Sequence, residues 1–64
     1  MKRRDLERHL REHGCQNVGD GARHAKWRGP QGAPTAVPRH AEILPGTVRA
    51  ICRQLGIPLP TSLS

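Results

Sequence analysis

Four apolar residues near the end of the chain recur at helical spacing, and this pattern constrains the fold more than any other feature. The spacing i, i+3, i+4, i+7 is followed by Val48, Ile51, Cys52 and Leu55. The helix is expected to start at Pro45-Gly46-Thr47, with Thr47 or Gly46 as its cap, and to end at Gly56. Because one amphipathic helix cannot bury its own apolar face, the rest of the chain must supply a second layer.

The other expected elements are short. Leu6 and Leu10 lie four residues apart and predict a helix over residues 5–13, which Gly14 ends. Three strands are expected over residues 15–18, 24–28 and 35–37, separated by turns at residues 19–21 and 29–32. Alternation is clearest in the middle strand, where Ala25 and Trp27 fall on one face and a basic set on the other: His24, Lys26 and Arg28.

The order helix, strand, strand, strand, helix predicts an α+β fold. We expect an αβββα two-layer sandwich, in which a three-stranded antiparallel sheet carries both helices on one face. The helices would cover Val18, Trp27 and Val37, with Cys15 and Cys52 also in the core. In 64 residues, of which 34% are hydrophobic, there is room for one small domain. We place it at residues 1–57, with residues 58–64 as a flexible tail.

The net charge of the chain favours particular classes of binding partner. Eleven Lys and Arg against five Asp and Glu give a net charge of +6. Nine of the eleven are Arg, whose planar guanidinium suits bidentate phosphate contacts. Nucleic acid is the leading partner class, and an acidic protein satisfies the same electrostatics. A high-GC coding sequence also raises arginine content, so composition by itself leaves these readings open.

Cysteine content and hydropathy indicate a cytoplasmic protein with reduced thiols. Two cysteines are fewer than a small disulfide scaffold usually carries. No apolar run follows the charged start of the chain, and none approaches the length of a membrane span. The cysteines and four histidines lack the usual spacing of a zinc site, apart from His9 and His13 four residues apart, so we expect no metal and no cofactor.

Three segments of the chain carry motifs in a specific order. The first is the N-terminal helix followed by Gly14-Cys15 and a strand. The second is Gly21-Ala22-Arg23-His24 with Trp27 three residues on. The third joins Val37-Pro38-Arg39-His40 to Gly46-Thr47-Val48-Arg49-Ala50-Ile51. Together they span residues 2–57 and resemble the HicA toxin family, whose corresponding elements are Gly-Ser-His-His for the second segment and Val-Pro-x-His with Gly-Thr-x-x-x-Ile for the third.

The resemblance implies a fold like a double-stranded-RNA-binding domain and translation-independent cleavage of mRNA. It implies a HicB-type antitoxin as partner in a hetero-oligomeric toxin–antitoxin complex. The catalytic histidine of the family corresponds to His24. Many relatives have a second histidine directly before it, where this chain has Arg23, and often a serine where Ala22 stands. If the preceding histidine takes part in the chemistry, this copy is a weaker enzyme; we expect instead that Arg23 acts as a phosphate ligand.

The residues around His24 suit metal-free RNA cleavage. A histidine titrates near neutral pH and can remove the proton of a 2′-hydroxyl that attacks the adjacent phosphorus. Nearby cations would stabilise the charge of the transition state. The expected RNA-binding residues are Arg23, Lys26, Arg28, Arg39 and His40. His40, at the end of the third strand, is the candidate acid for the leaving 5′-oxygen.

Two other readings remain open at this point. A non-catalytic RNA-binding domain would use the same basic face, and loss of His24 would then change little. A protein-interaction module would dock an acidic partner there and have no RNA affinity beyond that of any basic protein.

A lone histidine on an exposed strand is usually an ordinary surface residue, and it is the family resemblance that favours catalysis by His24. We expect Trp27 in the core and not stacked on a base, because no other large aromatic residue is present.

Overall fold

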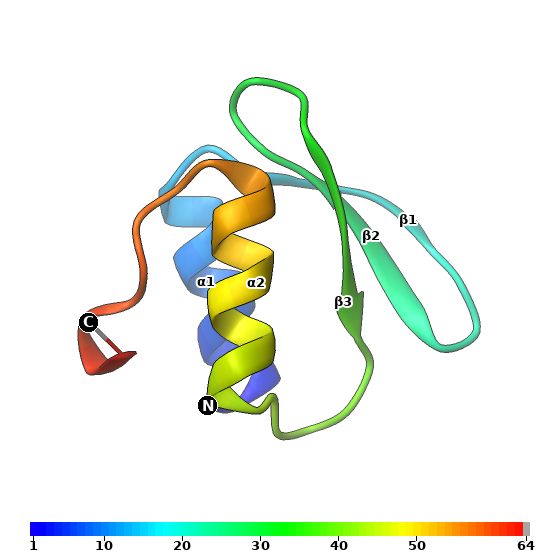
Figure 1. Ribbon diagram of the computed structural model, residues 1–64. Coiled ribbons are helices and arrows are strands. Elements are labelled where there is room, and N and C mark those ends of the chain that lie inside the picture. Colours follow the sequence, from blue (N-terminus) through cyan, green and yellow to red (C-terminus); the bar gives the residue numbers. More distant parts are fainter. Residues whose placement is uncertain (64) are drawn as a thin grey trace.

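A computed structural model describes residues 1–63 and contains two helices packed on one side of a three-stranded sheet (Figure 1). In chain order the elements are α1 (Arg3–Glu12), β1 (Gln16–Asp20), β2 (His24–Arg28), β3 (Pro34–Pro38), α2 (Pro45–Leu55) and the short 3-10 helix η1 (Thr61–Leu63). The strands pair antiparallel in the order β1-β2-β3. The predicted αβββα two-layer sandwich is confirmed.

Strand β1 is longer than expected and carries a bulge. The register passes from Asn17 opposite Trp27 to Gly19 opposite Lys26, which leaves Val18 without a partner. The Asn17 side chain accepts a hydrogen bond from the Gly19 amide at 3.0 Å, so a side chain competes with the sheet for that donor. Val18 is 50% exposed, and its predicted place in the core is wrong. The turn predicted at residues 19–21 is also wrong in part, because Gly19 and Asp20 pair with β2.

The starts of both helices differ from the sequence predictions. Helix α1 begins two residues early, where the Arg3 amide donates to the Ala41 carbonyl at 2.9 Å. Helix α2 begins at Pro45, ahead of the predicted cap at Gly46 or Thr47; its N-cap is Leu44, and no side chain caps it. Proline at the first helical position has no amide to satisfy and a suitable φ, so the predicted cap by Thr47 or Gly46 is not needed. Gly56 ends α2 with a φ of 74°, as expected.

The third strand includes a proline at each end. It was predicted over residues 35–37 and extends over Pro34–Pro38. Pro34 lies opposite Arg28, and Pro38 lies opposite His24. Because β3 is an edge strand, the missing amides of the two prolines cost no hydrogen bond inside the sheet.

The core lies between the helices and the sheet. Its buried residues are Leu6, Leu10, Cys15, Ala25, Trp27, Val37, Ile43, Val48, Ile51, Cys52 and Leu55. Ile43 is the member that sequence periodicity missed, because it lies in the loop before α2. Trp27 is 1% exposed, which confirms its core assignment, and the Arg11 guanidinium lies 5.7 Å from its ring centroid.

The residues that follow α2 contact the helices. Leu59 and Leu63 pack against the core, and the His9 ring nitrogen Nε2 lies 2.8 Å from the Pro58 carbonyl oxygen. Residue 64, the last of the expected tail, lies outside the described residues. Mobility of the segment from residue 58 onward stays a prediction.

Candidate functional site

The sheet face turned away from the helices is basic and free of carboxylates. Residues directly opposite one another in paired strands share a face, so the register defines this surface. Its members are Gln16, Gly19, His24, Lys26, Arg28, Pro34, Ala36 and Pro38. We call this set the open face. Of the five acidic residues of the chain, Asp5, Glu7 and Glu12 lie on α1, on the other side of the sheet, and none is on the open face.

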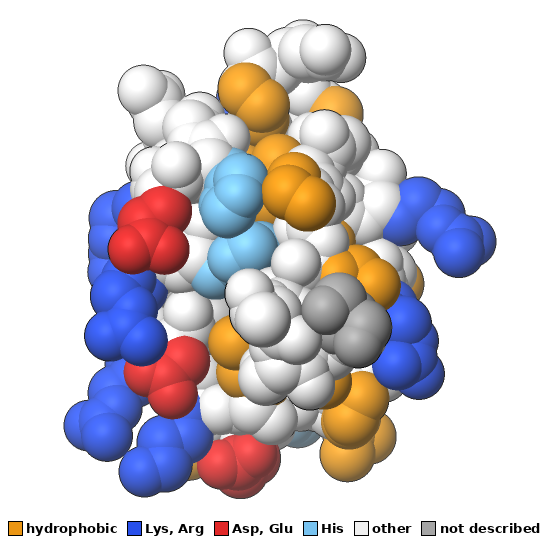
Figure 2. Space-filling view, turned by 90° about the vertical axis from the view of Figure 1, so that its left-hand side faces the viewer, with side chains coloured by type: hydrophobic (Ala, Val, Ile, Leu, Met, Phe, Trp, Pro, Cys, Tyr) orange, Lys and Arg blue, Asp and Glu red, His pale blue; other side chains and the backbone are white. Residues whose placement is uncertain are grey.

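The helical side of the molecule has a different character. Figure 2 shows Lys and Arg side chains along both rims of that side, with carboxylates among those on one rim and apolar side chains near the centre. An anionic ligand as large as RNA would meet repulsive carboxylates there. The open face offers positive charge without that opposition.

A tight hairpin positions Arg23 and His24. The Gly21 amide donates to the His24 carbonyl at 2.8 Å, which closes a two-residue loop at Ala22 and Arg23. A Cβ at Gly21 would lie 3.2 Å from that same carbonyl oxygen, so a side chain there would crowd the closing pair. His24 is the first residue of β2, and alternation places its side chain outside while Ala25 is buried.

A surface pocket joins this hairpin to the end of β3. It is lined by Ala22, Arg23, His24, Pro38, Arg39 and His40. The structure therefore brings together four of the six residues predicted for the site, although they come from two separate segments of the chain. We call this the His24 pocket.

Lys26 and Arg28 lie on the open face but outside the His24 pocket. Strand residues advance about 3.4 Å each, so Arg28 is about 14 Å along β2 from His24. The Arg28 guanidinium donates to the Gly32 carbonyl at 3.1 Å. These two cations extend the basic surface away from His24 and do not line the pocket around it.

Arg39 holds the two halves of the pocket together. Its backbone amide donates to the Arg23 carbonyl at 3.1 Å, and its guanidinium donates to the Gly21 carbonyl at 3.3 Å. The same guanidinium lies 4.0 Å from the Asp20 carboxylate. The sequence analysis predicted Arg39 to bind RNA, and these contacts give it a second role as the link between the hairpin and the end of β3.

Two residues near the pocket were missed from the sequence. Asp20 faces the Arg39 guanidinium. Arg3, at the start of α1, donates a hydrogen bond of 2.7 Å to the Arg39 carbonyl. Arg3 and Arg39 are 36 residues apart. No local spacing signals such a contact, since only the packing of α1 beside the end of β3 creates it.

The two histidines of the pocket are available to a ligand. Within residues 1–63, no hydrogen bond or ion pair engages the ring of His24 or His40. Both residues are exposed. Two imidazoles and two guanidiniums around one depression can exchange protons and bind phosphate oxygens at the same place.

The other candidate chemistry is not assembled in the described part of the chain. No group of three or more His, Cys, Asp or Glu side chains is arranged to hold a metal ion among residues 1–63. Burial raises the pKa of both the Cys15 and Cys52 thiols, which disfavours the nucleophilic thiolate. None of the helices in residues 1–63 is long and apolar enough to cross a membrane.

Comparison with known families adds to this geometry. The family model described as the HicA toxin of bacterial toxin–antitoxin systems matches residues 3–57, which is most of the chain. The chain belongs to the HicA toxin family. Comparisons with curated proteins and with solved structures gave no match. Membership of a toxin–antitoxin family implies an antitoxin partner, and in this HicA toxin the matched segment contains both the His24 pocket and the open face.

Proposed function

We propose that this HicA toxin is a metal-independent endoribonuclease that cleaves mRNA in the His24 pocket. The observation that carries the proposal is the convergence of Arg23, His24, Arg39 and His40 around one pocket beside a face without carboxylates. A polyanionic strand would be attracted to the open face, and its scissile phosphate would lie beside two histidines. Family membership supports the toxin role, and the resemblance of Gly21-Ala22-Arg23-His24 to the family motif supports His24.

In the proposed reaction RNA supplies its own nucleophile. His24 takes the proton of a 2′-hydroxyl, the 2′-oxygen bonds to the adjacent phosphorus, and the bond from phosphorus to the 5′-oxygen breaks. His40, or a water molecule, gives a proton to the leaving 5′-oxygen. The products are a 2′,3′-cyclic phosphate and a 5′-hydroxyl. The proton gained by His24 returns to solvent and restores the proton donor, so no water is consumed and no metal is required. Arg23 and Arg39 stabilise the negative charge of the pentavalent transition state.

The proposed protein partner is a HicB-type antitoxin that binds the toxin in a hetero-oligomeric complex. An antitoxin with acidic side chains on its binding surface would complement the open face and exclude RNA from it. Because the charge of +6 is spread over a domain of only 64 residues, complex formation should weaken as salt rises.

Cleavage of a labelled RNA by the purified protein in excess EDTA tests this proposal. We expect His24→Ala to lower the cleavage rate by about 10²–10⁴-fold, the usual worth of general acid–base catalysis. The matched control is His9→Ala, which removes an imidazole from α1 and should leave the rate unchanged. His40→Ala separates the two proton transfers: an unchanged rate would assign the second proton to water. Equal rates for wild type and His24→Ala would refute the proposed role of His24.

A second candidate is a non-catalytic RNA-binding toxin. It is favoured by Arg23, which occupies the position where many relatives carry a second histidine. In that case wild type and His24→Ala would bind RNA equally and neither would cut it. Both would also arrest growth equally when expressed in a bacterial host, whereas the nuclease hypothesis predicts arrest and mRNA loss from wild type alone.

A further inference from the structure

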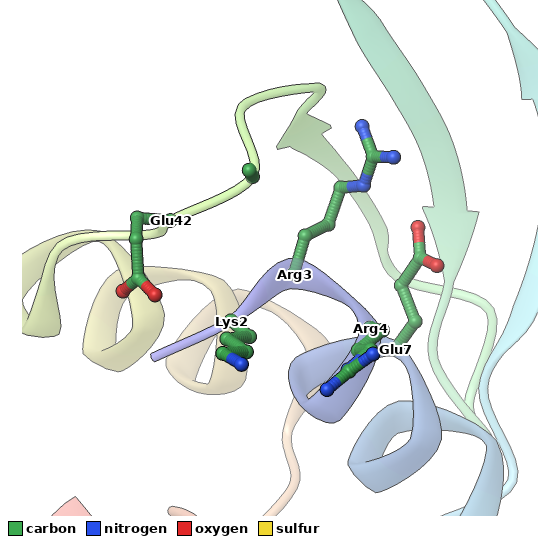
Figure 3. Close-up of a pocket in the computed structure, with 6 residues that line it drawn as sticks. Lys2, Arg3, Arg4, Glu7 and Glu42 are labelled. Carbon is green, nitrogen blue, oxygen red and sulfur yellow. The ribbon is translucent and has the colours of Figure 1, made fainter.

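A second pocket borders the His24 pocket and has no role in the mechanism above. It lies where the start of α1 meets the loop before α2, and it is lined by Lys2, Arg3, Arg4, Glu7, Ala41 and Glu42 (Figure 3). The two pockets share one stretch of chain, since residues 39 and 40 line one and residues 41 and 42 line the other. The Arg3 guanidinium joins them through its 2.7 Å hydrogen bond to the Arg39 carbonyl.

Two cations of this second pocket are not neutralised by the protein. Lys2 and Arg4 are exposed, and within residues 1–63 neither has an ion pair or side-chain hydrogen bond. Figure 3 shows both side chains extending to the same side of the start of α1, while Arg3 extends to the other. Of the two carboxylates in the lining, that of Glu42 is engaged by the Met1 ammonium at 3.2 Å. An anion is therefore the expected ligand between Lys2 and Arg4.

The remaining carboxylate, Glu7, makes the pocket more selective than a plain anion site. It is partly buried, it points toward the Arg3 side of the pocket, and no ion pair within residues 1–63 neutralises it. A carboxylate repels free phosphate but accepts hydrogen bonds from the amino groups of nucleobases. Because the two cations and Glu7 lie on different sides of the start of α1 within one pocket, a ligand that satisfies both carries a phosphate at one end and an amino group at the other, as a nucleotide does (Figure 3).

We propose that this pocket is a second nucleotide subsite for the same RNA strand that occupies the His24 pocket. It takes a phosphate between Lys2 and Arg4 and the amino-bearing edge of cytosine, adenine or guanine at Glu7. The proposal rests on the RNA-cleaving function proposed above. His40 and Glu42 are two residues apart, a span of at most about 7 Å, so a nucleotide close to the scissile phosphate can reach the subsite.

RNA binding in a His24→Ala background tests the subsite, because the RNA stays intact during the measurement. Two double substitutions are made in the His24→Ala protein: Lys2→Ala/Arg4→Ala and Arg49→Ala/Arg53→Ala. Their affinities for a short labelled RNA are compared by fluorescence anisotropy. The second pair removes the same charge from α2, where these arginines line a different pocket. Circular dichroism verifies that each variant is folded. We expect the Lys2/Arg4 pair to reduce the slope of log affinity against log salt by about 0.7, for the one phosphate that the two cations bind, and the control pair to reduce it much less.

Base preference provides the second readout. The affinities of RNAs that differ in one base near the cleavage site are measured for the protein with Glu7 and for Glu7→Gln, whose side-chain amide both donates and accepts hydrogen bonds. Wild-type Glu7 is expected to disfavour uracil, which has no amino group, and Glu7→Gln to remove that discrimination. Equal losses for the two charge pairs, or no base preference, would overturn the subsite. The subsite would also be overturned if the Lys2/Arg4 pair weakened binding of an acidic protein and left RNA binding unchanged, because the pocket would then be a protein-docking site.

The two proposals fail in different ways. RNA that binds through Lys2 and Arg4 but is never cut by the wild-type protein would refute the nuclease and leave the subsite in place. RNA that is cut by the wild type, with equal effects of the two charge pairs, would refute the subsite alone. Absence of any RNA binding would refute both.

Discussion

Replacement of Gly29 by alanine tests the packing that holds the sheet to α2. Gly29 follows β2, in the turn that leads to β3, and its amide donates to the Ala33 carbonyl at 2.8 Å. A Cβ at Gly29 would lie 2.4 Å from the carbonyl oxygen of Leu55, the last residue of α2. Ordinary contacts of this kind start at 3.4 Å, so the turn and the helix end must separate by about 1 Å.

The size of the effect follows from that displacement. Both partners in the clash are backbone, which no rotamer change can relieve, and such overpacking costs about 1–3 kcal/mol. A chain of this length has a total free energy of unfolding of about 3–10 kcal/mol. Because 1 kcal/mol shifts the Tm of a small domain by about 4–8 °C, a cost near 2 kcal/mol lowers Tm by about 8–16 °C.

Thermal unfolding followed by circular dichroism measures this change, and Gly46→Ala is the matched control. Nothing lies within 4 Å of a Cβ at Gly46, which is in the first turn of α2. Alanine there should stabilise the helix by about 0.5 kcal/mol, since glycine loses more backbone entropy on folding. A Gly29→Ala protein as stable as wild type would refute the close approach of this turn to α2.

Three further outcomes are expected. Arg39→Ala should slow RNA cleavage several-fold with little change in Tm, because its exposed ion pair with Asp20 and its exposed hydrogen bond to the Gly21 carbonyl contribute little stability and its backbone bond to Arg23 remains; a large Tm loss would contradict this. Burial raises the pKa of Cys15 and Cys52, so the unfolded chain loses its thiol protons at lower pH than the folded chain. The free energy of unfolding, measured by urea titration, should therefore fall as pH rises above the ordinary thiol pKa of 9.0. A variant with alanine at both positions should show no such fall. Truncation after Ile57 should lower Tm, because Leu59 and Leu63 pack on the core, and an unchanged Tm would indicate a loose tail.

Much of the fold could be read from local sequence because periodicity reports burial directly. The spacing of Val48, Ile51 and Leu55 predicted the buried face of α2, and the alternation of Ala25 and Trp27 predicted the buried face of β2. Val18 was misplaced because alternation assumes an unbroken register, and the Asn17 side chain breaks the register there.

One part of the candidate site follows from local sequence, and the other depends on tertiary structure. His24 and Arg23 are neighbours in the sequence, and a glycine-led hairpin beside an alternating strand was sufficient to place them together on an exposed surface. Arg39 and His40 could be named only as cations or titratable groups near a strand end, because their approach to Arg23 depends on β3 pairing with β2.

The sequence by itself determined the elements, their order, the basic charge and the family, since each is encoded in residue type and local spacing. Tertiary structure alone decided which distant residues meet. It placed α1 against the chain after β3, where Arg3 bonds to Arg39 and the second pocket forms beside the His24 pocket. The physical reason is that hydrogen bonds and pockets depend on distances across the fold, which packing of the core sets and no local pattern records.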